Sequence, residues 1–306
     1  MVRVVFVGGL GRSGTTLLER ILGELPDVCP LGEVVHLWRR DLCDDERCAC
    51  GTPFSRCDFW QAVGEHAFGG WQHVDVARVL ALREAVERTR HIPRLAATRL
   101  PDRYRALVTE YAGYYAAVYR GAAAVSGAEV VIDSSKHSAL AYCLRWSSDI
   151  DLRVVHMVRD SRGVAYSWTK AVTRPEAAGI DEMAQYPPGR SALLWNAHNA
   201  AFGLLHRRGV PVRRIRYEAL LTDPAGTVRD LADFAGVPTG PLDFLTDRSV
   251  RLGPCHSAAG NPMRFATGEI PLRHDEAWRL HLPRRQRRLV GVLTAPFLAL
   301  YGYGRR

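Results

Sequence analysis

Lysine is nearly missing from this chain. Lysine and arginine together number 41, yet lysine occurs only at Lys136 and Lys170. Long apolar runs are missing too: the longest, LVGVLTAPFLALYGYG, is broken by Pro296 and is too short to cross a bilayer, so it predicts a terminal helix and no transmembrane segment. No internal repeat or low-complexity linker divides the 306 residues, which predicts a single domain over residues 1–306.

A secretory leader is also lacking, because MVRVVFVG enters a strand pattern without a basic region or a cleavage site. The chain has seven cysteines, an odd number. Together with the missing leader pattern, this number predicts a cytoplasmic protein whose cysteines are mostly reduced. The net charge of +9 suits an anionic ligand, and charge alone would equally suit nucleic acid or a membrane surface. Aromatic residues do not interleave a basic stripe, and no nucleic-acid-binding signature occurs, so we expect no nucleic-acid partner.

Four apolar, β-branched segments predict buried strands, and each is followed by a helical pattern. The strands are expected at 2–8, 129–133, 152–159 and 212–217, and the helices at 15–25, 137–146, 161–172 and 218–236. This alternation predicts an α/β fold, a P-loop-type doubly wound parallel sheet flanked by helices. A helical, cysteine-rich insertion occupies residues 33–126 or so. Ligands of such sheets bind beyond the carboxyl ends of the strands.

The loop GGLGRSGTTL after the first strand has the glycines and hydroxyls of a phosphate-binding turn. The lysine of the nucleoside-triphosphate version is replaced by Thr15, and only Asp133 and Asp160 are candidates for the usual Mg²⁺ carboxylate. Arg12 instead supplies a permanent cation that can bind two oxygens at once. The loop therefore favours an anion without a triphosphate or an obligate metal. A P-loop small-molecule kinase or phosphotransferase that uses ATP and Mg²⁺ is the alternative, favoured only by the fold.

The sequence resembles the sulfotransferases that use 3′-phosphoadenosine 5′-phosphosulfate (PAPS). The likeness lies in GRSGTTLL, PLGEVVHLW, VIDSSKHS, VVHMVRDSRGVAYSW, IRYEALLTDP and HSAAGNPMRF, in that order. It is closer to the bacterial and tyrosylprotein branches, which have R-S-G-T-T, than to the cytosolic animal enzymes. The resemblance implies that the 5′-phosphate and sulfuryl oxygens are held by Arg12, Ser13, Gly14, Thr15 and Thr16.

The resemblance also implies a second phosphate site. An arginine and a serine at the spacing of Arg159 and Ser167 hold the ribose 3′-phosphate in this family. Tyr217 would lie near the adenosine, although a core tyrosine is an equal alternative. Asn261 and Arg264 resemble the segment that closes over the 3′-phosphate.

Two residues compete for the role of general base. The resemblance assigns it to Glu33, whose pKa we expect partial desolvation to raise. His36 lies one helical turn further on and is the alternative. Lys136 follows a strand end, and its compact ammonium can follow charge onto a bridging oxygen, as the family's lysine near the sulfuryl group would. Arg12 and Lys136 would thus stabilise the transferring group.

Four cysteines lie close together in the segment LCDDERCACGTPFSRCDFW, at Cys43, Cys48, Cys50 and Cys57. The spacing leaves three interpretations open: a reduced or locally disulfide-bonded structural loop, a zinc site without paired C-x2-C knuckles, or a redox-responsive loop. We predict no metal site and no obligate metal cofactor. The remaining cysteines, Cys29, Cys143 and Cys255, are expected to pack as small apolar residues.

The predicted reaction moves a sulfuryl group from PAPS to an acceptor hydroxyl and leaves 3′,5′-adenosine diphosphate. The acceptor, a secondary metabolite or a carbohydrate, would bind between the helical insertion and the loop at 173–190. An aryl sulfate donor and a non-catalytic nucleotide-binding module are further alternatives. The identity of the acceptor and the oligomeric state cannot be read from the sequence.

Overall fold

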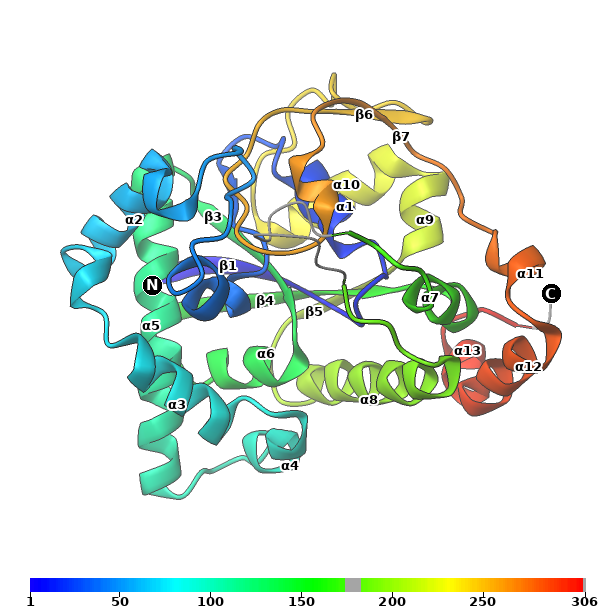
Figure 1. Cartoon of the computed structure of the whole chain (residues 1–306), viewed down its shortest axis with the longest axis horizontal. Coiled ribbons are helices and arrows are strands. Elements are labelled where there is room, and N and C mark those ends of the chain that lie inside the picture. Colours follow the sequence, from blue (N-terminus) through cyan, green and yellow to red (C-terminus); the bar gives the residue numbers. More distant parts are fainter. Residues whose placement is uncertain (174–182, 305–306) are drawn as a thin grey trace.

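A five-stranded parallel sheet forms the centre of the molecule (Figure 1). The computed structural model describes residues 1–173 and 183–304. The strand order is β2-β3-β1-β4-β5. The strands are β1 (Val2–Gly8), β2 (Val28–Pro30), β3 (Val130–Lys136), β4 (Ile150–Val158) and β5 (Val212–Arg216). The predicted α/β class is confirmed, and the predicted strands correspond to β1, β3, β4 and β5. The edge strand β2 was not predicted, because three residues are too few to show a period.

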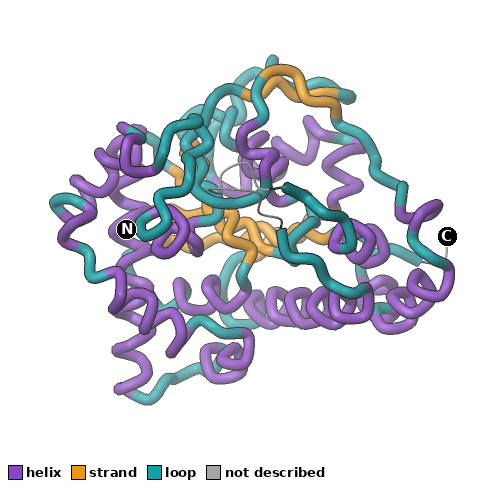
Figure 2. The backbone as a smooth tube through the Cα atoms, in the orientation of Figure 1, coloured by secondary structure: helices purple, strands orange, loops and turns teal. Residues whose placement is uncertain are grey.

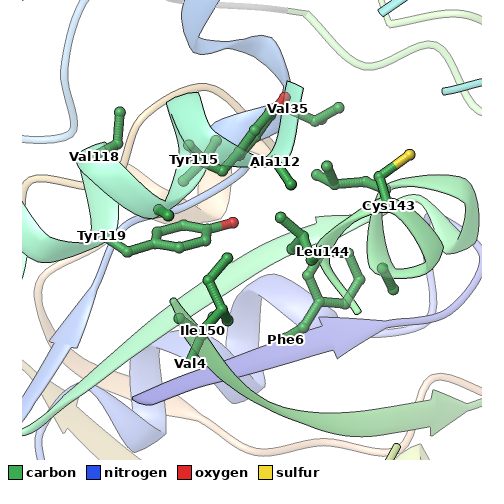
Figure 3. Packing of buried hydrophobic residues seen from close by; sticks show 14 of the residues in the cluster. Val4, Phe6, Val35, Ala112, Tyr115, Val118, Tyr119, Cys143, Leu144 and Ile150 are labelled. Carbon is green, nitrogen blue, oxygen red and sulfur yellow. The ribbon is translucent and has the colours of Figure 1, made fainter. Parts of the chain in front are cut away.

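Helices cover both faces of this sheet, and alternate residues of β1 point to opposite faces. Val4 and Phe6 belong to the larger core, beneath α5 (Asp102–Ser126), α6 (Ser138–Leu144) and α8 (Pro188–His206). Figure 3 shows Phe6 beside Leu144, with Tyr115 and Tyr119 of α5 above the strands. On the other face, Val5 and Val7 pack with α1 (Thr15–Leu22), α9 (Tyr217–Thr222) and α10 (Pro224–Ala235).

The predicted helices are present but shorter than expected. The helix expected at 161–172 is α7 (Ser161–Trp168), and the one expected at 218–236 is broken into α9 and α10. The break falls at Asp223, whose carboxylate accepts a hydrogen bond from Gly226 N at 2.8 Å, just before Pro224 starts α10. Proline tolerates only the first turn of a helix, so a new helix begins there.

The expected insertion is largely helical. It contains α2 (Asp58–Phe68), α3 (Val76–Val86), α4 (Ile92–Leu95) and α5, which Figure 2 shows as helices beside one end of the sheet. Short helical turns at Val34–His36, Leu37–Asp41, Phe54–Arg56, Trp71–His73 and Thr89–His91 connect them. Trp38 and Trp60 are fully buried in the same core as the sheet, so the insertion packs onto the sheet through a continuous core.

The C-terminal part of the chain surrounds one end of the sheet. It consists of a hairpin of β6 (Ser249–Leu252) and β7 (Gly268–Pro271), followed by α11 (Trp278–His281), α12 (Arg284–Leu293) and α13 (Ala295–Leu300). The terminal helix expected from the apolar run is thus two helices, separated at Thr294. Across residues 1–173 and 183–304, no helix has both the length and the apolar character needed to cross a membrane.

Candidate active site

The loops at the carboxyl ends of β1, β3 and β4 meet at a cavity of about 790 Å³. This volume lies within the usual range for small-molecule sites. The sequence-predicted residues that line it are Arg12, Gly14, Thr15, Thr16, Glu33, His36, Lys136, Arg159, Ser167, Tyr217 and Asn261. Residues far apart in the sequence therefore meet where the doubly wound topology predicts a ligand.

The loop between β1 and α1 has the geometry of an anion-binding turn. Gly14 has φ of 91° and caps α1, so the amino end of that helix faces the cavity. Within the described residues, four buried polar atoms of this loop have no hydrogen-bond partner: Arg12 Nε and Nη2, Ser13 Oγ and Thr15 Oγ1. Buried donors without partners are costly, so this loop fits an oxyanion that would accept from them. Ser13 itself is only 1% exposed and does not line the cavity.

We predict that Gly14→Ala destabilises the protein, because this position needs both a positive φ and free space. A β-carbon at Gly14 would lie 2.4 Å from the ring of Tyr217. The backbone strain alone costs about 1–2 kcal/mol, and the displaced tyrosine adds to it. The matched control is Gly113→Ala in the exposed part of α5, where a β-carbon would meet nothing within 4 Å. This substitution should increase the free energy of unfolding by about 0.5–1 kcal/mol. Urea unfolding of both variants measures the difference, and equal stability would contradict the prediction.

Glu33, His36 and Lys136 form one hydrogen-bonded cluster. Lys136 Nζ donates to Glu33 Oε1, and the other carboxylate oxygen lies 3.6 Å from His36 Nε2. Burial raises the pKa of Glu33, but the charge of Lys136 and the contact with His36 outweigh it and hold the pKa below its ordinary value. Our expectation of a raised pKa is therefore wrong. The expectation considered only the desolvation of Glu33. In the structure, Lys136 from the end of β3 lies against the carboxylate and stabilises its ionised form.

Burial also lowers the pKa of His36, although Glu33 opposes the shift. The imidazole is therefore mostly neutral near pH 7 and can accept a proton. Its ring also stands edge-on to the ring of His137, with centroids 5.8 Å apart. His36 thus stays an alternative to Glu33 as the general base.

The backbone holds this cluster in an unusual conformation. Lys136 has φ of 67°, and β3 has one extra residue opposite β1 between the pairs Phe6–Asp133 and Gly8–Lys136. Such a bulge redirects the following side chain, here toward Glu33. Arg12 also has a positive φ, of 73°. Residues other than glycine seldom adopt a positive φ. Because Arg12 and Lys136 both do so and both line the cavity, we infer that this backbone strain is kept for function.

Arg159 directly follows β4, and Ser167 lies in the next helix, α7, as the sequence predicted. The guanidinium donates to Arg12 O at 3.1 Å and to Asp275 Oδ2 at 3.2 Å. It also lies over the ring of Tyr217, 4.7 Å from the centroid. Arg159 therefore contacts the loop between β1 and α1, and its charge is partly neutralised by the carboxylate of Asp275.

The sequence left open whether Tyr217 lies near the adenosine or packs in the core, and the structure is compatible with both. It starts α9 and lines the cavity, yet its ring also packs against the core of the α1 face. The ring covers Gly14 on one side and meets Arg159 on the other. An aromatic surface is thus present at the cavity wall.

The structure places Asn261 at the cavity and Arg264 away from it. Arg264 is 1% exposed, and its guanidinium donates to the carbonyls of Ser257 and Arg47, at 2.9 Å and 2.7 Å. These contacts give no support to the expected contact of Arg264 with the 3′-phosphate, which stays a prediction. Sequence reasoning could not distinguish a ligand-binding arginine from one that satisfies loop carbonyls.

The two carboxylates considered for Mg²⁺ are engaged elsewhere. Asp133 is fully buried and accepts from Tyr119 Oη at 2.5 Å and from Ser135 N at 2.7 Å. Asp160 caps α7 and pairs with Arg162. Neither lines the cavity.

Several cavity residues were missed from the sequence. Trp168 stacks on Tyr186 at 4.4 Å, and its Nε1 donates to Gly11 O at 3.0 Å, next to the phosphate loop. On the side of the helical insertion, His137 Nδ1 lies 3.0 Å from a carboxylate oxygen of Glu87. Part of the expected acceptor loop, residues 174–182, lies outside the described residues, but Met183, Ala184 and Tyr186 line the cavity.

Glu19 was missed as well. Its carboxylate is buried beneath the cavity and accepts from Gly32 N at 2.6 Å, Ser134 Oγ at 2.6 Å and Ser257 Oγ at 2.9 Å. It thereby ties α1 to the turn before Glu33 and to the end of β3. The sequence offered one signal for Glu19: an acidic residue on the side of the predicted helix that faces the sheet.

Comparison with known proteins identifies the family. The model of the Sulfotransferase family matches residues 4–49 and 82–241, which cover most of the chain. This chain therefore belongs to the sulfotransferase family, as its resemblance implied. Membership supports sulfuryl transfer over the phosphotransferase alternative. A comparison with curated protein sequences finds no match.

Solved structures support the same fold. The sulfotransferase domain of the Synechococcus PCC 7002 olefin synthase superposes with a TM-score of 0.50 and 20% identity, covering 96% of this chain and 94% of that domain. The sulfotransferase domain from the curacin biosynthetic pathway gives a TM-score of 0.51 and 16% identity, covering 97% and 98%. At these identities the likeness concerns the fold.

Proposed function

We propose that this sulfotransferase takes the sulfuryl group from PAPS and transfers it to an acceptor hydroxyl. The observation that carries the proposal is that one cavity offers two candidate anion sites, each with an arginine from a different strand end. The first is the Arg12 loop with the amino end of α1, and the second is Arg159, with Ser167 also lining the cavity. A 5′-phosphosulfate and a ribose 3′-phosphate would need two such sites, and ATP lacks the second group. Tyr217, between the two sites, offers its ring to the adenosine.

The roles of the reacting-centre residues follow from their contacts. Glu33, ionised because of its lowered pKa, accepts the proton of the acceptor hydroxyl. Arg12, Thr15 and Thr16 donate to the phosphosulfate oxygens, in a loop whose buried donors are already oriented. Lys136 stabilises the charge that develops on the leaving phosphate.

The pairing of Lys136 with Glu33 couples these two roles. When Lys136 turns from the carboxylate toward the leaving oxygen, Glu33 loses the charge that lowers its pKa. With that charge removed, the pKa of Glu33 rises, because burial is then opposed only by His36 among the main causes. The base thus becomes stronger at the step in which it must take the proton.

The acceptor would bind on the side of the helical insertion. Arg40, Glu87 and His137 line the cavity there, and Tyr186 and Trp168 also line it. These groups suit a polar acceptor with several hydroxyls beside an aromatic wall, such as a carbohydrate or a hydroxylated secondary metabolite.

The first experiment titrates the purified protein calorimetrically with 3′,5′-adenosine diphosphate and with ATP plus Mg²⁺. We expect tight binding of the former and a preference for it over ATP. Arg159→Ala should raise the dissociation constant about thirtyfold, since a charge-assisted contact of this kind contributes about 2 kcal/mol.

The matched control is Arg162→Ala, because Arg162 pairs with Asp160 and does not line the cavity. Its dissociation constant should equal that of the unchanged protein. A preference for ATP and Mg²⁺ would refute the donor assignment. Binding of neither nucleotide, with turnover of an aryl sulfate, would replace PAPS by that donor.

A further inference from the structure

Three cysteines of the cysteine-rich segment converge on a histidine from a distant part of the chain. Cys48, Cys50, Cys57 and His256 offer ligand atoms that all lie within 4.8 Å of one another. Cys57 and His256 are separated by 199 positions in the sequence. Cys43, the fourth cysteine of the segment, is not part of this group; its Sγ donates to Trp38 O at 3.3 Å.

The distances within the group agree with a tetrahedral site. Cys57 Sγ lies 3.6 Å from Cys48 Sγ and 3.7 Å from Cys50 Sγ. His256 Nδ1 lies 3.3 Å from Cys57 Sγ and 3.9 Å from Cys48 Sγ. Four ligands at ordinary Zn–S and Zn–N lengths would be separated by about 3.6–3.8 Å. One ion at the centre would therefore reach all four with little movement.

The same distances disfavour the disulfide interpretation. All seven cysteines are free, and the sulfur separations are well above the roughly 2 Å of a bond. Any bond within the group would also leave the third sulfur and the imidazole unused. Cys48 and Cys57 are 1% and 2% exposed, so two of the three sulfurs are shielded from oxidants.

The surroundings hold the ligands in place. Cys48 N donates to Thr52 O at 2.9 Å, and Gly51 N to Cys48 O at 2.9 Å, which closes a tight hairpin around Cys50. Gly51 has φ of 94°, which the turn requires. Trp60 Nε1 donates to His256 O at 2.8 Å, and Phe59 stacks on the imidazole with centroids 4.9 Å apart. Metal sites are commonly oriented by such outer contacts.

We propose that Cys48, Cys50, Cys57 and His256 bind one structural Zn²⁺. Three thiolates and a neutral imidazole are a common ligand set for closed, four-coordinate zinc. Binding displaces the thiol protons to solvent and involves no change of oxidation state. The family match ends at residue 49 and resumes at 82 before ending at 241, so three of the four ligands lie outside it.

The ion would join two segments that shape the reacting centre. The segment that follows His256 runs beside the turn carrying Glu33: Ala258 N donates to Leu31 O at 2.8 Å, and Glu33 N to Ala259 O at 3.2 Å. A β-carbon at Gly260 would lie 2.7 Å from Glu33 Oε1, which shows how closely this backbone covers the carboxylate. The zinc site thus fastens the segment over Glu33 to the insertion.

The test measures zinc in the full-length protein purified without chelator. We expect about one zinc per chain by elemental analysis, and less than about a tenth in Cys57→Ser. Cys43→Ser is the matched control and should retain the full amount, since it removes a cysteine of the same segment that lies outside the group. Equal zinc in the two variants would overturn the proposal.

Two further measurements keep the proposal testable if Cys57→Ser fails to fold. Cys50→Ser removes the ligand at the hairpin tip, and it should lose zinc and unfold at a lower temperature. Replacing zinc by Co²⁺ should produce the visible bands of a tetrahedral thiolate complex in the protein and in Cys43→Ser. A disulfide between Cys48 and Cys57 found by mass spectrometry, or reduced protein that takes up neither ion, would refute the site. None of these readouts depends on the sulfuryl donor.

Discussion

Glu33→Gln is expected to lower turnover by about a hundredfold or more while 3′,5′-adenosine diphosphate binds as before. Glutamine keeps the shape of the side chain but cannot accept a proton. The nucleotide groups would contact Arg12, Arg159 and Ser167. Among the described residues, no hydrogen bond or ion pair joins these three to Glu33, whose carboxylate reaches Arg12 only through its charge. Steady-state turnover with an acceptor, together with calorimetric titration, measures both parts of the prediction.

The competing base is tested with His36→Gln. If Glu33 is the base, the low pKa of its carboxylate keeps it ionised as the pH falls through neutrality, so kcat should stay level to well below pH 6.5. If His36 is the base, activity must fall as the imidazole gains its proton. The general base would be His36 if two results were found together: turnover is unchanged in Glu33→Gln, and the loss of kcat at acidic pH disappears in His36→Gln.

Lys136→Ala is expected to lower turnover by about a hundredfold while it raises the dissociation constant of 3′,5′-adenosine diphosphate only a few-fold, because its ammonium is needed most where charge develops. The change also removes the cation that holds the pKa of Glu33 down. The pKa of Glu33 should therefore rise, and the acidic limb of kcat should move toward higher pH. Turnover and its pH profile are the measurements.

The control for this prediction is the other lysine of the chain. Lys170 pairs with Asp275 and does not line the cavity, so Lys170→Ala should alter kcat by no more than about twofold. If Lys136→Ala weakened nucleotide binding as much as it lowered kcat, Lys136 would act in ground-state binding rather than at the transition state.

Local sequence information determined the architecture of this protein. Apolar, β-branched runs predicted the four longer strands, and their alternation with helical patterns predicted a parallel sheet. GGLGRSGTTL predicted the glycine-rich turn at the start of α1, because glycine conformations and helix ends act over a few residues. The three-residue β2 escaped detection because it is too short to show a pattern. The break at Asp223 was missed although Asp223 and Pro224 are a local signal for the start of a new helix.

The tertiary structure decided what depends on distant partners. It buried Arg264 against loop carbonyls, and it placed Lys136 against Glu33, so that the pKa of the carboxylate falls rather than rises. It also brought His256 to three cysteines nearly two hundred positions away. Electrostatic shifts and ligand sets depend on distances in space, which the sequence fixes only through the complete fold. The candidate reactive residues could be predicted from the sequence, but the side chains that contact them in the fold could not.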